Sequence, residues 1–129
     1  MYQVMIVDDE PMAASLIVNI IKRKYSNFDI MGTAYDGEEA LELMEKKGEP
    51  DVLITDIQMP VMNGLKLVEE TKKRYPEVLS VIVSGYQEFE YAKQAIAFGV
   101  CDYILKPIVP SEFAKLIVKI EEKLRQKYY

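Results

Sequence analysis

Residues 4 to 11 read VMIVDDEP, a short apolar run that ends in three acidic side chains and a proline. With the residue before it, this run forms QVMIV at 3–7, which is typical of a strand that is buried on both faces, as in a parallel sheet. Asp8, Asp9 and Glu10 follow directly, and Pro11 suits the first turn of a helix. Three carboxylates therefore gather where a core strand ends, and their charge needs an explanation.

Further apolar runs, at residues 28–34, 51–55, 79–84 and 102–105, also predict buried strands. The segments between and after the runs carry apolar residues at helical spacing. These residues are Met12, Leu16 and Ile20; Ala40, Leu41 and Met44; Leu65 and Val68; Tyr91, Ala92, Ala95 and Ile96; and Phe113, Leu116, Ile117, Ile120 and Leu124. Five strand and helix units of about 25 residues each predict an α/β fold, a doubly wound five-stranded parallel sheet with right-handed crossovers.

Helix-start signals agree with this division of the chain. Asp36 with Glu39 three residues later resembles a capping box, and Asn63 can cap the helix that follows it. Pro110 suits the first turn of the last helix. The helices are therefore expected to begin close to residues 11, 37, 64 and 110.

The composition limits the classes of function. Half of the 129 residues are apolar, which is enough for one packed domain, and the net charge is −5. This negative charge argues against direct nucleic-acid binding, since phosphates would repel it. Cys101 is the only cysteine, so no disulfide can form within the chain, and no long apolar segment or leader sequence is evident. These features favour a cytoplasmic protein that does not insert into a membrane.

In open parallel sheets the functional crevice lies beyond the carboxyl ends of the strands. Asp8 and Asp9 follow the first predicted strand, Asp56 the third, Ser84 ends the fourth, and Lys106 follows the fifth. Each has a structural explanation when taken alone: the acidic pair as a helix cap, Asp56 as a turn residue, Ser84 as a cap, and Lys106 as a surface lysine. Their convergence on one sheet edge favours a functional site.

The charge of that predicted site is unbalanced. Two like charges 4 Å apart repel by roughly 4 kcal/mol at an effective dielectric constant of 20. Three carboxylates with one lysine therefore require further positive charge. A hard cation suits oxygen ligands, and Mg²⁺ is the natural choice because it needs few protein ligands and keeps several waters.

Four ordered motifs now allow a comparison with a known family. They are IVDDEP at 6–11, ITDIQMPVMNGL at 54–65, VIVSGY at 81–86 and DYILKPI at 102–108. Together they resemble the receiver domain of two-component response regulators, and the resemblance covers essentially the whole chain, residues 1–129. It implies a flavodoxin-like sheet with strand order 2-1-3-4-5. SGYQEFEYAKQAI at 84–96 is similar to receivers linked to helix-turn-helix output domains of the arabinose-regulator type.

The resemblance implies a role for each site residue. Asp56 would be the phospho-acceptor and a metal ligand. Asp9 would bind Mg²⁺ directly, Asp8 mainly through water, and Gln58 through its backbone carbonyl.

Four more positions carry roles in the family. Ser84 would bond the phosphoryl group, Lys106 would be its cationic partner, and a cis peptide bond would precede Pro107. Tyr103 matches the aromatic switch position. Activation would then change the surface of the fourth helix, fifth strand and fifth helix, which includes Tyr91, Ala95 and Phe98.

The partners also follow from the resemblance. The chain contains no histidine, so the donor would be a phosphohistidine on a partner histidine kinase. The domain would not be an enzyme, although it would assist its own phosphorylation and dephosphorylation. We expect an output domain, absent from these residues, that controls transcription, and a homodimer is possible. Gln58 and Tyr86 leave the phosphoryl lifetime open.

Three other functions use similar features. A flavin-binding carrier shares the topology, but it would want a glycine- and hydroxyl-rich loop where this chain has DDEP. A Mg²⁺-dependent phosphatase would have a second acid two residues after the nucleophile, where Gln58 stands. A receiver that serves only as a docking scaffold usually lacks an acid, hydroxyl or lysine that is present here.

Overall fold

The sheet is the central element of the computed structural model, which describes residues 1–85, 99–100 and 102–128. Its five strands are all parallel and lie in the order β2-β1-β3-β4-β5. They are β1 (Tyr2–Val7), β2 (Phe28–Ala34), β3 (Val52–Asp56), β4 (Leu79–Ser84) and β5 (Asp102–Leu105). The predicted fold class and strand order are confirmed.

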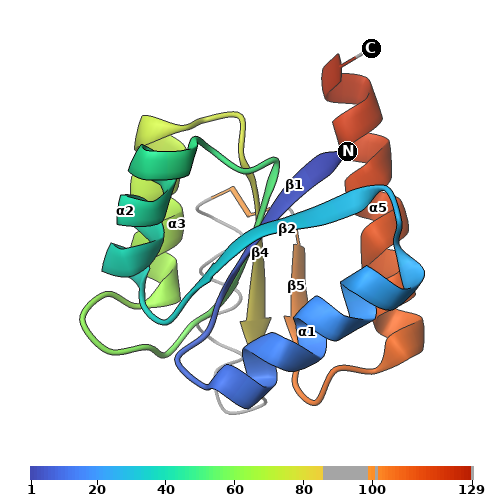
Figure 1. Cartoon of the computed structure of the whole chain (residues 1–129), viewed down its shortest axis with the longest axis horizontal. Coiled ribbons are helices and arrows are strands. Elements are labelled where there is room, and N and C mark those ends of the chain that lie inside the picture. The colour runs from blue at the N-terminus through green and yellow to red at the C-terminus, as the bar shows by residue number, and fades with distance from the viewer. Residues whose placement is uncertain (86–98, 101, 129) are drawn as a thin grey trace.

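Helices cover both faces of the sheet (Figure 1). α1 (Pro11–Lys24) and α5 (Pro110–Tyr128) pack on one face, while α2 (Gly37–Lys47) and α3 (Gly64–Arg74) pack on the other. The predicted helical stripe that includes Tyr91 and Ala95 lies outside the described residues. Among the helices of the described ranges, none is long and apolar enough to cross a membrane.

Side chains along each strand point alternately to the two faces of the sheet and so contribute to two separate cores. Val4 and Ile6 of β1 belong to the cluster under α1 and α5, whereas Met5 and Val7 belong to the cluster under α2 and α3. Successive strand residues point to opposite faces, so a strand covered on both sides reads as a continuous apolar run. This explains why the sequence VMIV lacks the polar alternation of a half-exposed strand.

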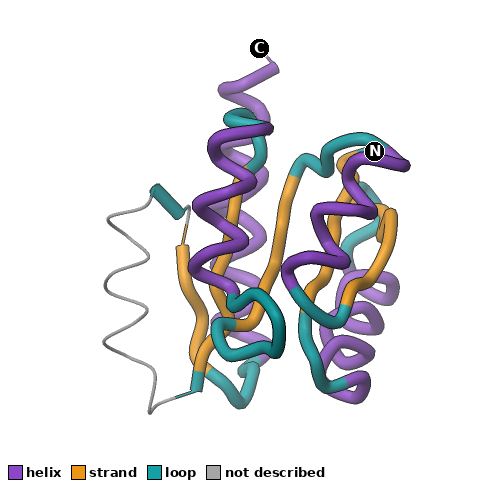
Figure 2. Tube along the Cα trace, turned by 90° about the vertical axis from the view of Figure 1, so that its left-hand side faces the viewer, coloured by secondary structure: helices purple, strands orange, loops and turns teal. Residues whose placement is uncertain are grey.

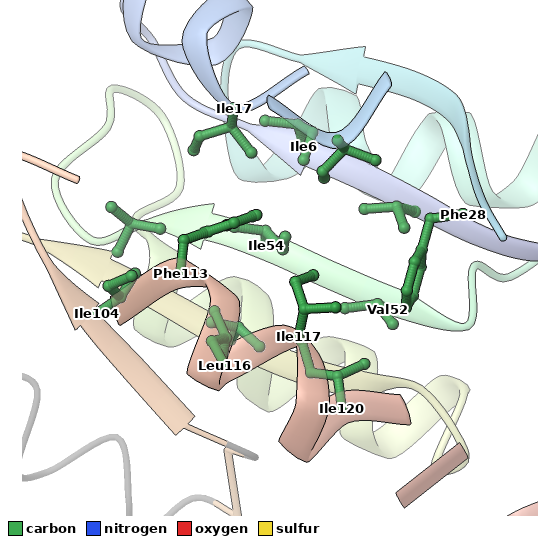
Figure 3. Packing of buried hydrophobic residues seen from close by; sticks show 14 of the residues in the cluster. Ile6, Ile17, Phe28, Val52, Ile54, Ile104, Phe113, Leu116, Ile117 and Ile120 are labelled. Atoms are coloured by element: carbon green, nitrogen blue, oxygen red, sulfur yellow. The ribbon is translucent and has the colours of Figure 1, made fainter. Parts of the chain in front are cut away.

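The larger core lies between the sheet and the pair α1 and α5. Figure 3 shows Phe113 of α5 pointing toward Ile54 of β3, and both side chains are almost fully buried. The predicted stripe of α5 is buried along its whole length, from Phe113 to Leu124. The final helix is therefore fixed by apolar packing, which also fixes the loop before it.

The buried face of α1 differs from the stripe that predicted the helix. Met12 and Leu16 are 86% and 50% exposed, and the buried residues are Ala14, Ile17 and Ile21. α1 is apolar on more than one side, so spacing alone identifies a helix without fixing its rotation about its axis. The side of α1 that faces the sheet is the one that contains Ala14, whose small side chain allows the helix to approach the sheet closely.

The predicted helix starts are confirmed. The Asp36 side chain accepts the Glu39 amide at 2.8 Å, and the Asn63 side chain accepts the Lys66 amide at 2.9 Å. Pro11 and Pro110 are the first residues of α1 and α5. These caps set where each loop at the carboxyl edge of the sheet ends.

The loops that follow β1, β3 and β5 lie at one edge of the sheet, which is the lower edge in Figures 1 and 2, and β4 also ends at this edge. A doubly wound topology requires this arrangement, because all parallel strands end on the same side. Side chains at these strand ends therefore meet although they are distant in sequence.

The rotation of α1 can be tested with two neighbouring substitutions. Ile17→Ala should lower the free energy of unfolding by about 3 kcal/mol, because it leaves a cavity in the core. Leu16→Ala should change it by less than about 1 kcal/mol, because half of that side chain is already in water. Urea denaturation of both variants measures the difference, and equal losses would contradict the observed rotation.

Candidate functional site

Asp8, Asp56 and Lys106 meet at the carboxyl edge of the sheet. Val7 of β1 pairs with Thr55 of β3, so the next residues, Asp8 and Asp56, lie side by side. Lys106 extends from the end of β5, and its Nζ lies 3.1 Å from Asp8 Oδ2 and 3.3 Å from Asp56 Oδ2. One ammonium group is thus shared between two buried carboxylates.

Asp9 completes an acidic cluster. One carboxylate oxygen from each of Asp8, Asp9 and Asp56 lies within 4.8 Å of the other two. Asp8 and Asp56 are buried, while Asp9 is exposed. The cluster is therefore open to solvent on the side of Asp9.

Helix capping does not account for Asp8. Its Oδ1 accepts the Glu10 amide at 3.0 Å, which closes a turn before α1. The residue at the N-cap position is Glu10, which makes no side-chain capping hydrogen bond. The second carboxylate oxygen of Asp8 is directed to Lys106 instead.

The backbone around Asp56 is held by three hydrogen bonds. The Ile57 amide donates to Asp56 Oδ1 at 2.8 Å, and the Thr55 hydroxyl donates to the Asp56 carbonyl at 2.9 Å. The Gly64 amide donates to the Ile57 carbonyl at 2.7 Å. These contacts fix the carboxylate against the end of its own strand.

Gly64 has a role that the sequence did not reveal. A Cβ at this position would lie 1.9 Å from the Asp56 carbonyl oxygen, far inside van der Waals contact. The glycine lets the start of α3 approach the Asp56 backbone directly. The only sequence signal was the Asn63-Gly64 pair, which indicates a helix start and says nothing about this approach.

Burial raises the pKa of Asp56 from its ordinary value of 3.8 to about 6. Lys106 opposes this rise and Asp8 adds to it, so one shared cation does not compensate for the loss of water. The pKa of Lys106 is lowered by its own burial, but attraction to Asp56 and the hydrogen bond to Asp8 outweigh this and raise it. At neutral pH both groups are charged.

Ser84 lies at the end of β4, next to the same edge. Its hydroxyl is fully buried and has no hydrogen-bond partner among the residues that the structure describes. The Lys106 amide donates to the Ser84 carbonyl at 2.8 Å, which ties the ends of β4 and β5 together. The Lys106–Pro107 peptide bond is cis, as the resemblance implied.

The other predicted site residues are placed with less detail. Gln58 comes two residues after Asp56 and its side chain is exposed, so its backbone role stays a prediction. Tyr103 is half-buried and packs against Ile57, Val68 and Ile82. Tyr86 and the predicted switch surface at Tyr91, Ala95 and Phe98 lie outside the described residues.

The donor set fits a hard divalent cation. Three carboxylates face one lysine, which leaves two negative charges uncompensated when all four groups are ionised. Their oxygens are clustered and reachable from water, as Mg²⁺ requires, because this ion takes oxygen ligands and retains several waters. The site could therefore hold Mg²⁺.

A family model, the response regulator receiver domain, matches residues 4–118. The chain belongs to this family. The residues of the cluster, Ser84 and Lys106 all fall inside the matched range. The family that the four motifs suggested is confirmed.

Two of the relatives that this chain matches are bacterial transcriptional regulatory proteins by name. The uncharacterised transcriptional regulatory protein YesN of Bacillus subtilis is 34% identical over 98% of this chain and 34% of its own length. The transcriptional regulatory protein HptR of Staphylococcus aureus is 35% identical over 96% of this chain and 48% of its own length. This chain thus spans less than half of either regulator.

A solved structure shares this fold over almost the whole chain. The REC domain of AraT, a response regulator from Geobacillus stearothermophilus, has a TM-score of 0.91 and 38% identity. The match covers 99% of this chain and 98% of that one. The fold and the receiver family are therefore supported by sequence and structure alike.

The raised pKa of Asp56 predicts a pH dependence of stability in metal-free protein. Between pH 3.8 and about 6 the folded protein keeps a proton that the unfolded chain has released, so stability falls as pH rises through this window. Above it, Asp56→Asn should be more stable than wild type by up to about 3 kcal/mol. Below pH 4 the difference should vanish.

Urea denaturation of both proteins in chelator, at pH 4 and pH 7, measures this difference. If the cluster holds Mg²⁺, the ion at pH 7 should stabilise wild type more than Asp56→Asn, because it would bind the folded state through this carboxylate. A difference in stability that is the same at both pH values would contradict the raised pKa.

Proposed function

We propose that this receiver domain is a phosphorylation-dependent switch in which Asp56 accepts a phosphoryl group from a phosphohistidine on a partner histidine kinase. The observation that carries the proposal is the position of the Asp56 carboxylate. It is buried, lies 3.3 Å from the Lys106 ammonium, and shares a cluster with Asp8 and Asp9. No other arrangement of the described residues combines an acid cluster with such a cation.

Asp8, Asp9, Asp56 and the backbone carbonyl of Gln58 would hold Mg²⁺. When bound, the ion would supply positive charge for the oxygens of a transferring phosphoryl group. The support for this assignment is the uncompensated negative charge of the cluster and its access to water.

The carboxylate of Asp56 is prepared for attack. With a pKa of about 6 it is ionised at neutral pH, and the Ile57 amide orients it through Oδ1. A carboxylate oxygen forms the new bond to phosphorus while the bond from phosphorus to the imidazole nitrogen of the donor breaks. The electron pair of that bond leaves with the imidazole. Lys106 stabilises the charge on the phosphoryl oxygens, which is the main task in phosphoryl transfer.

The acyl phosphate would change the bonding of Ser84. Its buried hydroxyl lacks a partner among the described residues, and a phosphoryl oxygen would be a strong acceptor. A new bond would draw the end of β4 toward Asp56. Tyr103, on the neighbouring β5, could then move inward, and the surface around β5 and α5 would change.

Control of transcription is the output that the relatives favour. YesN and HptR are transcriptional regulators by name, and this chain spans only 34% and 48% of their respective lengths. We infer that the domain, residues 1–129, acts on a DNA-binding output domain, of helix-turn-helix type, either directly or by forming a homodimer. It would assist its own phosphorylation and dephosphorylation but convert no separate substrate.

The phospho-acceptor assignment predicts a single modification. Incubation with a small phosphodonor and Mg²⁺ should add one phosphoryl group to wild type, and intact mass should show none on Asp56→Asn. Chelation of the metal should abolish the addition to wild type. Stoichiometric labelling that persists in Asp56→Asn would assign the site to another residue.

The proposed switch predicts that substitutions can separate phosphoryl addition from the structural response to it. Lys106→Ala and Ser84→Ala should retain some phosphorylation, because Asp56 and the metal ligands remain, but should weaken the structural response. With saturating beryllofluoride and Mg²⁺, amide spectra of wild type should shift at β5 and α5, and these shifts should shrink in both variants. Shifts confined to the loops around Asp8, Asp56 and Ser84 in wild type would refute the switch.

A further inference from the structure

The loop between β3 and α3, residues 57–63, carries the predicted Gln58 ligand and follows Asp56 directly. Its two ends are joined by the hydrogen bond from the Gly64 amide to the Ile57 carbonyl. The ends are therefore fixed, but this bond does not determine the path of the middle of the loop.

The middle of the loop has an unfavourable backbone conformation. Val61 has a φ of 68°, in the left-handed region that β-branched residues avoid. Its side chain is 75% exposed, so burial does not compensate for the strain. The Met62 amide bonds back to the Pro60 carbonyl at 2.7 Å across this tight turn. Such a conformation persists only where neighbouring contacts impose it.

Those contacts come from the first turn of α2. The Gly37 amide donates to the Met62 carbonyl at 3.2 Å. The Met62 side chain also lies directly over Gly37, since a Cβ on that glycine would be 2.7 Å from Met62 Cγ and 2.8 Å from Met62 Sδ. Residue 37 must be glycine because a Cβ would clash with the Met62 side chain, and not because its backbone needs dihedral angles that other residues avoid.

Both partners in this contact are anchored in the domain. Gly37 is buried at the start of α2, which the Asp36 cap fixes through the Glu39 amide. Met62 packs against the core cluster under α2 and α3. The contact therefore connects a rigid helix end to the loop that begins at Asp56.

We propose that Gly37 and Met62 are positioning residues for the metal site: the start of α2 holds the 57–63 loop so that the Gln58 carbonyl and the Asp56 carboxylate face the same ion. This inference rests on the proposed function of the cluster as a Mg²⁺ site. Neither residue touches the acidic cluster through a contact that the structure describes, so both act through the loop. Groups that orient metal ligands typically contribute about 10- to 100-fold to metal affinity.

The test is Mg²⁺ affinity, measured by isothermal titration calorimetry on wild type, Gly37→Ala, Met62→Ala and the double variant. Gly37→Ala should bind Mg²⁺ about tenfold more weakly, because its new Cβ displaces Met62 and the loop. Met62→Ala should also bind Mg²⁺ more weakly, because the loop loses the side chain that packs over Gly37. The double variant should lose less than the product of the two single losses, since the smaller side chain relieves two of the three close contacts.

Met31→Ala is the matched control. Met31 is also a partly buried methionine packed against the same cluster, but it lies in β2 and not in the loop. It should lose stability in urea denaturation while its Mg²⁺ affinity stays within about twofold of wild type. This separates an effect on loop position from a general loss of packing.

Two outcomes would overturn the inference, and they are distinguishable. If wild type shows Mg²⁺ binding that Asp56→Asn removes, but Gly37→Ala and Met62→Ala bind as tightly as wild type, the contact is structural only. If wild type shows no Mg²⁺ binding that depends on Asp56, the proposed function of the cluster fails as well. Should Gly37→Ala not fold, unchanged affinity in Met62→Ala decides against the inference.

Discussion

Two carboxylates, on Asp8 and Asp56, share the ammonium group of Lys106 at 3.1 and 3.3 Å in a place from which most water has been removed. At an effective dielectric constant of 20, one such contact between opposite charges contributes roughly 5 kcal/mol of Coulomb energy, and two like charges about 4 Å apart lose roughly 4 kcal/mol. One lysine therefore offsets the repulsion between the two carboxylates. It does not also offset the free-energy cost of removing them from water. The raised pKa of Asp56 reports this imbalance.

The fold maintains this unfavourable arrangement by enclosing it with rigid elements. Val7 and Thr55 are paired in the centre of the sheet, so the backbones of Asp8 and Asp56 that follow are held side by side. Lys106 is fixed by the bond from its amide to Ser84 and by the packing of α5 beyond the loop. Local strain at functional sites persists when the surrounding structure is this well determined. Apolar packing on both faces of the sheet thus supports a site that by itself lowers stability.

Much of this arrangement could be predicted from the sequence because it depends on periodicity and topology. Continuous apolar runs located the strands to within one residue at each end, and the Asp36 and Asn63 caps located the starts of α2 and α3. Because parallel strands all end at one edge of the sheet, the sequence alone predicts that Asp8, Asp56 and Lys106 meet there.

The parts that sequence could not predict depend on contacts between elements. α1 is apolar on several sides, so spacing did not show that Ile17 would be buried and Leu16 half-exposed. The left-handed backbone of Val61 and the approach of Gly64 to the Asp56 carbonyl both occur in or beside the loop between β3 and α3, where it packs against other elements. The neighbouring sequence does not indicate either feature. The residue types alone are compatible with several conformations, and packing between elements selects one of them.

The unpaired hydroxyl of Ser84 links this static picture to the proposed switch. A buried hydroxyl without a partner, as it stands among the described residues, costs about 1 to 3 kcal/mol. An acceptor oxygen supplied near Asp56 would recover that cost only in a conformation that brings Ser84 within reach. Because 1.4 kcal/mol corresponds to a tenfold change in an equilibrium constant, this one bond could shift a two-state equilibrium by about 5- to 150-fold. Lys106, released from sharing its charge between two carboxylates, would add to the same shift. The energy for the proposed switch would therefore already be present in the resting site, as a hydrogen bond that the Ser84 hydroxyl does not make with any described residue.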